Sequence, residues 1–100
     1  MSMKQVQTST ADAALDLAAA ALGFLAADPE RLGRFLALSG LDPSEVRAAA
    51  ADPGFLPAVL DYVLADESLL LAFAAAQGIA PERVARTRAA LGGQSYERST

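Results

Sequence analysis

The sequence predicts an all-α protein, a compact single-domain bundle of five to six short helices arranged as two similar helical units. Alanine fills 24 of the 100 positions, whereas valine and isoleucine together fill six, and this balance favours helices over strands. Three Asp-Pro pairs, at residues 28–29, 42–43 and 52–53, are typical of helix starts, because aspartate caps a helix and proline suits its first turn. We expect a helical domain over residues 11–91 and disordered tails over residues 1–10 and 92–100.

The chain contains a loose internal repeat, in which residues 22–46 match residues 60–84 at a shift of 38 positions. The matched positions have structural roles, such as a cap, core residues, a helix-ending glycine and a proline at a helix start. If both copies fold alike, Phe35 and Phe73 are both buried, each packed near the leucine one turn before it. The matching pairs are Leu22 and Leu60, Ala27 and Ala65, Asp28 and Asp66, Leu32 and Leu70, Phe35 and Phe73, Ala37 and Ala75, Gly40 and Gly78, Pro43 and Pro81, and Val46 and Val84.

The first helix is expected from about Ala11 to Ala27. Its apolar residues cover most of the circumference and leave a narrow stripe of acidic and small residues. That stripe either faces water or lets another backbone come close. The apolar set is Leu15, Leu17, Ala18, Ala21, Leu22, Phe24 and Leu25, and the stripe is Asp12, Asp16, Ala20, Gly23 and Ala27.

Glycines and the Asp-Pro pairs set the limits of the later helices. Gly40 and Gly78 each stand where a helix ends in a left-handed residue followed by an apolar one. Pro57 lacks an N–H group for the carbonyl of residue 53, so the fourth helix starts irregularly. The fifth helix carries leucine and phenylalanine on all sides, which predicts the most buried element. The expected ranges are Pro29–Ser39, Pro43–Ala51, 55 or 56 to 65, Glu67–Gln77, and Pro81 to about Leu91.

The composition argues against catalysis, metal binding and membrane insertion. Cysteine, histidine and tryptophan are absent, so no histidine can activate a serine or threonine. Asp61, Asp66 and Glu67 are explained more simply by a helix cap and an exposed helix face than by a metal or acid/base site. Residues 17–27 resemble a signal-peptide core, but cleavage there would delete most of the first helix. We expect no enzyme, no cofactor and no metal, and a cytoplasmic protein.

The leading hypothesis for function is a small protein-binding or regulatory module. Leu38 is expected on the same side of helix 29–39 as Arg31 and Arg34. An exposed apolar residue bordered by charge is typical of a surface for another protein or for a homodimer. The alternatives are that Leu38 belongs to the core and that the arginines form an ordinary solvated helix face.

The alternative function is that of a DNA-binding protein of the helix-turn-helix type. Both repeats join two helices through a glycine turn, and the helix after Gly78 carries Arg83, Arg86 and Arg88, as a groove-reading helix would. The net charge of −4 opposes attraction to phosphate backbones. Many ordinary helix pairs also share this turn, so nucleic acid is the less favoured partner.

Two segments carry a recognisable pattern, LGFLAADPERLGRFLALSGLDP at residues 22–43 and AVLDYVLADESLLLAFAAAQG at residues 58–78. Through them the chain resembles a family of short alphaproteobacterial proteins designated domain of unknown function 3572. The resemblance covers nearly everything between the two tails and is most specific at residues 28–31 and 40–41. It implies a compact, bacterial, all-helical protein, and it implies no activity and no functional residues.

Overall fold

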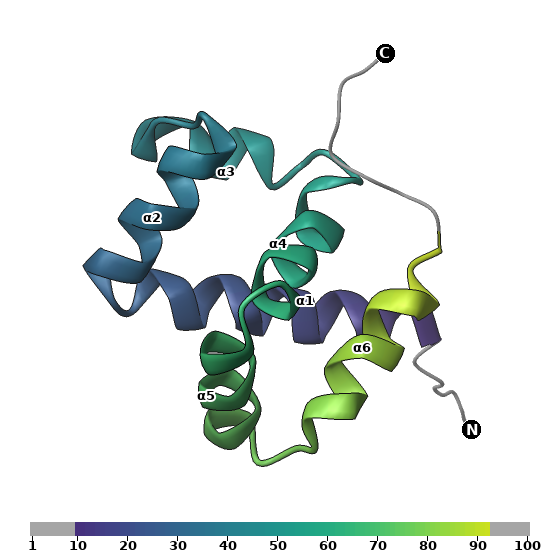
Figure 1. The fold of residues 1–100 in the computed structure, drawn as a ribbon. Helices are drawn as coiled ribbons and strands as arrows, with labels where there is room; N and C mark the ends of the chain where they lie inside the picture. Colours follow the sequence, from purple (N-terminus) through teal and green to yellow (C-terminus); the bar gives the residue numbers. More distant parts are fainter. Residues whose placement is uncertain (1–9, 93–100) are drawn as a thin grey trace, which may run out of the picture.

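The computed structural model describes residues 10–92, which form helices joined by short connections (Figure 1). No strand occurs within this range, so the predicted all-α fold is confirmed. The predicted tails lie outside the described residues, except for Thr10, which begins the first helix, and Gly92. The elements are α1 (Thr10–Ala26), α2 (Pro29–Ser39), the 3₁₀ helix η1 (Pro43–Glu45), α3 (Val46–Ala49), α4 (Phe55–Leu64), α5 (Glu67–Gln77) and α6 (Pro81–Ala90).

Helix α4 is the central element of the fold. It packs against α1, α5 and α6, while α1 also contacts α2 and α6 (Figure 1). Its buried residues are Phe55, Pro57, Val59, Leu60 and Val63. The expectation that α5 is the most buried helix is wrong, because Leu71 on α5 is 48% exposed and much of the helix's alanine-rich surface faces water. Alanine is found both in cores and on surfaces, so an alanine-rich helix can be apolar on all sides without being covered on all sides.

Helix α1 packs against the core through a buried stripe of three alanines and one leucine. Ala14, Ala18, Ala21 and Leu25 recur at helical spacing and are all buried. The stripe of acidic and small residues predicted on α1 mostly faces water, and the space beside Gly23 is open. Leu15, which the sequence pattern assigned to the apolar set, is one of the exposed large hydrophobic residues. The contact of α1 with the core therefore uses mainly alanines, and Leu15 lies at the edge of this buried stripe.

The two copies of the repeat share their local structure. Helices α2 and α5 begin after Asp28 and Asp66, whose backbone angles are −122° and 107° in the first and −124° and 109° in the second. Both carboxylates accept hydrogen bonds from backbone N–H groups of the first helical turn. Phe35 and Phe73 are both buried, which confirms that prediction. The preceding leucines, Leu32 and Leu70, are both partly buried against the core cluster.

The copies differ in their third helix. In the second copy it is α6, which seats Val84 in the core, whereas in the first copy it is only η1 and the single turn of α3, with no buried residue. The predicted helix over 43–51 is thus too long. The Asp52 carboxylate accepts a hydrogen bond from the Gly54 N–H at 2.8 Å and fixes a turn that directs the chain into α4. Pro57 then falls in the first turn of α4, where an intrahelical N–H bond is not needed.

Replacing Gly40 or Gly78 with alanine is expected to lower the free energy of unfolding by about 1 kcal/mol each. Their φ angles are 72° and 69°, in the left-handed region, and nothing lies within 4 Å of an added Cβ, so the cost comes from backbone strain alone. Urea denaturation followed by circular dichroism measures it. Gly33, inside α2 with open space around it, is the control: alanine there should stabilise the protein by about 0.5–1 kcal/mol. Equal effects at Gly33 and Gly40 would contradict the assigned helix end.

Candidate functional site

The exposed side of α2 carries Leu38 and Arg34, which lie one helical turn apart. The side chain of Leu38 is 74% exposed, more than any other large hydrophobic residue in the described chain. Arg34 is exposed as well, and no ion pair or hydrogen bond joins its guanidinium to another residue within 10–92. This arrangement leaves a leucine and a cation together on the surface, both open to another molecule.

Arg31, the third residue predicted for this surface, is partly engaged within the fold. Its guanidinium carbon lies 4.7 Å from the centre of the Phe24 ring, and its Nε lies 3.8 Å from an Asp28 carboxylate oxygen. The Phe24 ring in turn packs at 5.5 Å from the Phe73 ring. Arg31 therefore links α2 to the end of α1, in a cation–π contact, and leaves Arg34 as the more available cation. We call Arg31, Arg34 and Leu38 the α2 surface.

The three arginines predicted as a DNA-reading set do not lie together. Arg88 donates from Nε to an Asp61 carboxylate oxygen at 2.7 Å and from Nη1 to the Gly92 carbonyl at 2.9 Å, and its side chain is only 16% exposed. It joins α6 to α4 and to the residues that follow α6. Arg86 is two positions away, which on a helix places the two side chains on opposite sides. Helical spacing alone could have shown this separation.

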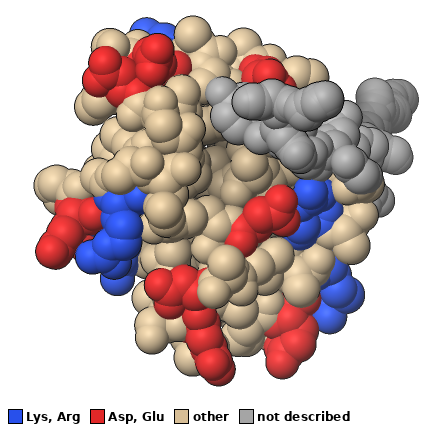
Figure 2. Space-filling view, turned by 45° about the horizontal axis from the view of Figure 1, so that its top comes forward, with Lys and Arg blue, Asp and Glu red and all other residues tan. Residues whose placement is uncertain are grey.

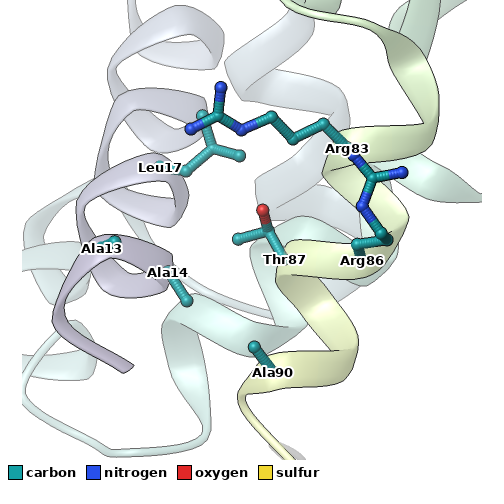
Figure 3. Close-up of a pocket in the computed structure, with 7 residues that line it drawn as sticks. All are labelled: Ala13, Ala14, Leu17, Arg83, Arg86, Thr87 and Ala90. Carbon is teal, nitrogen blue, oxygen red and sulfur yellow. The ribbon is translucent and has the colours of Figure 1, made fainter. Parts of the chain in front are cut away.

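Arg83 and Arg86 line a groove between α1 and α6 with a volume of about 230 Å³ (Figure 3). Figure 3 shows the Arg83 side chain reaching across toward Leu17 of α1, with the Thr87 hydroxyl directed into the space between the helices. Sequence reasoning missed this groove, because it gave no reason to place α1 beside α6. The lining residues are Ala13, Ala14, Leu17, Arg83, Arg86, Thr87 and Ala90.

Charged side chains of both signs are interspersed over the face shown in Figure 2, with no continuous basic patch. Within residues 10–92 no three acidic side chains are grouped so that they could hold a metal ion. Asp66 serves as the cap of α5, accepting from the Leu69 N–H at 3.2 Å, and Asp61 holds Arg88. No helix in the described part of the chain is long and apolar enough to cross a membrane. The candidate sites are therefore the α2 surface and the α1–α6 groove.

The chain belongs to a protein family of unknown function, DUF3572, whose model matches residues 11–94. This match confirms the resemblance that the segments at 22–43 and 58–78 indicated. Searches of the curated proteins and of the solved structures gave no match. Family membership thus covers the whole helical domain and assigns no activity to it.

Proposed function

We propose that this member of the DUF3572 family is a small protein-binding module that holds its partner on the α2 surface. The observation that supports this most is the exposure of Leu38, at 74%, on a helix whose opposite side is well buried. A single exposed leucine is common on protein surfaces. The combination with Arg34, one turn away and without an acidic partner among the described residues, favours a contact surface.

The two side chains supply different parts of the binding energy. Full burial of a leucine contributes about 1.5–3 kcal/mol, and Leu38 has most of that still to gain because three quarters of it is exposed. A guanidinium binds a carboxylate through two parallel hydrogen bonds, which fixes the orientation of the partner. The partner that fits has an apolar pocket bordered by an aspartate or glutamate.

Leu38→Glu is expected to weaken partner binding at least about tenfold, because it removes the apolar contact and sets a negative charge beside the partner's carboxylate. Partners captured from cells that express the protein naturally are identified by mass spectrometry, and their affinities for the purified variants are then measured by calorimetry. Arg34→Glu should have a comparable effect. Each variant should lower the free energy of unfolding by no more than about 0.5 kcal/mol, since both residues are exposed.

Leu71→Glu is the matched control for this experiment. It places the same charge at another exposed leucine, on α5, and should leave the affinity unchanged. Equal losses for the Leu38 and Leu71 variants would contradict a specific α2 surface. Binding of duplex DNA at moderate salt, lost in Arg86→Glu and kept in Leu38→Glu, would replace the proposal with the DNA-binding alternative.

A bacterial, cytoplasmic setting is part of this proposal. Residues 17–27, which resemble a signal-peptide core, include Ala18, Ala21 and Leu25, all fully buried in the core cluster. Cleavage after this segment would remove these core residues from the folded domain. We therefore infer that the segment stays in the protein and is not a cleaved signal peptide. Fractionation of expressing cells, with mass measurement of the purified chain, tests the setting.

A further inference from the structure

Arg83 and Arg86 are two cations one helical turn apart that have no acidic partner among residues 10–92. By contrast, Arg31 and Arg88 each lie beside an aspartate and form an ion pair with it. Like charges at this spacing repel each other and weaken a helix slightly. A bound anion would relieve that repulsion.

The rest of the groove is largely apolar. Ala13, Ala14 and Leu17 come from α1 and Ala90 from α6, while the Thr87 hydroxyl is the one further polar side chain in the lining (Figure 3). The volume of about 230 Å³ lies below the range of roughly 300–1,000 Å³ that is usual for drug-sized ligands. A ligand that fills it is therefore a small molecule with a short apolar body.

We propose that the α1–α6 groove binds a small organic carboxylate, with its charged end between Arg83 and Arg86 and its hydrocarbon body along Leu17 and the alanines. A guanidinium matches the two oxygens of a carboxylate, and the Thr87 hydroxyl can donate a further hydrogen bond. Inorganic phosphate suits the groove less well, because it has no hydrocarbon part to cover Leu17 and the alanines of the lining. The inference is independent of the α2 surface.

The test uses the full chain and hexanoate, which has eight non-hydrogen atoms, in a titration followed by amide chemical shifts. A ligand of this size, held at an open groove, is expected to bind with a Kd of about 1 mM. Saturable shifts should appear at Ala13, Leu17, Thr87 and Ala90. In the double variant Arg83→Gln and Arg86→Gln the affinity should fall at least about tenfold. The control Arg47→Glu, at an exposed position on α3, changes the net charge by the same amount and should leave the affinity unchanged.

Three further ligands separate the contributions of charge and body. Acetate has the carboxylate of hexanoate without its long hydrocarbon chain, and hexylamine has a hydrocarbon chain with a positive charge. Inorganic phosphate is an anion with no hydrocarbon chain. All three should bind more weakly than hexanoate. Equal binding of hexylamine, equal or tighter binding of phosphate, hexanoate shifts that persist in the Arg83 and Arg86 double variant, or the absence of saturable shifts in the groove would each overturn the proposal.

Discussion

Phe73→Ala is expected to lower the free energy of unfolding by about 3–5 kcal/mol. The Phe73 side chain is fully buried in the core cluster, and its ring packs 5.5 Å from that of Phe24. Truncation removes this aromatic contact and leaves a cavity that the surrounding helices fill only in part. Because domains are typically stable by only about 5–15 kcal/mol, the variant should lose a large part of its stability. Denaturation by urea, followed by circular dichroism, measures the loss.

Two further variants make this measurement specific. Leu71→Ala, two residues away on the same helix at an exposed position, should cost less than about 1 kcal/mol. Phe35→Ala, at the equivalent position of the first repeat, should cost as much as Phe73→Ala, because Phe35 is also buried and packs 6.0 Å from Phe55 and 5.1 Å from Tyr62. A small loss at Phe73 together with a large loss at Leu71 would mean that α5 is rotated from the orientation described above.

The limits of α2 and α5 could be predicted from the sequence to the residue. Their starts are set by Asp28 and Asp66, and their ends by Gly40 and Gly78, through interactions within a few residues of the chain. Such local chemistry acts in the same way wherever the helix sits in the fold. The same reasoning failed for α3, which ends at Ala49 although the residues up to Ala51 are good helix formers. The chain turns over residues 50–54 instead, where the Asp52 carboxylate accepts a hydrogen bond from the Gly54 N–H.

The burial of the helices was harder to predict, because it depends on which faces meet. In α1 the pattern favoured Leu15 as an apolar contact, but Ala14 is buried and Leu15 is exposed. Alanine is compatible with either environment, so a chain with 24 alanines gives a weak signal for the direction of each helix face. The same ambiguity led to the wrong expectation that α5 is the most buried helix.

The candidate site was predictable only where a single helix determines it. The spacing of Arg31, Arg34 and Leu38 placed them on one side of α2, and the exposure of Leu38 agrees with that. The bond between Arg88 and Asp61 joins residues 27 positions apart, and the groove needs α1 beside α6. Both depend on the tertiary arrangement, for which the sequence contains no direct signal.

Ala21→Leu is expected to lower the free energy of unfolding by about 1–3 kcal/mol, because the added carbons have no room. Ala21 is fully buried on α1, between Ala18 and Leu25 in the stripe that faces the core. Leucine is nearly as good a helix former as alanine, so a loss of stability reports on packing and not on helix propensity.

Ala19→Leu provides the control for that measurement. Residue 19 lies on the same helix at an exposed position, so leucine there should change the stability by no more than about 0.5 kcal/mol. Thermal denaturation of the two variants and the parent protein under the same conditions compares them. If Ala21→Leu is as stable as Ala19→Leu, then α1 does not approach the core closely through its alanines. The difference in stability between the two variants therefore tests how closely α1 packs against the core.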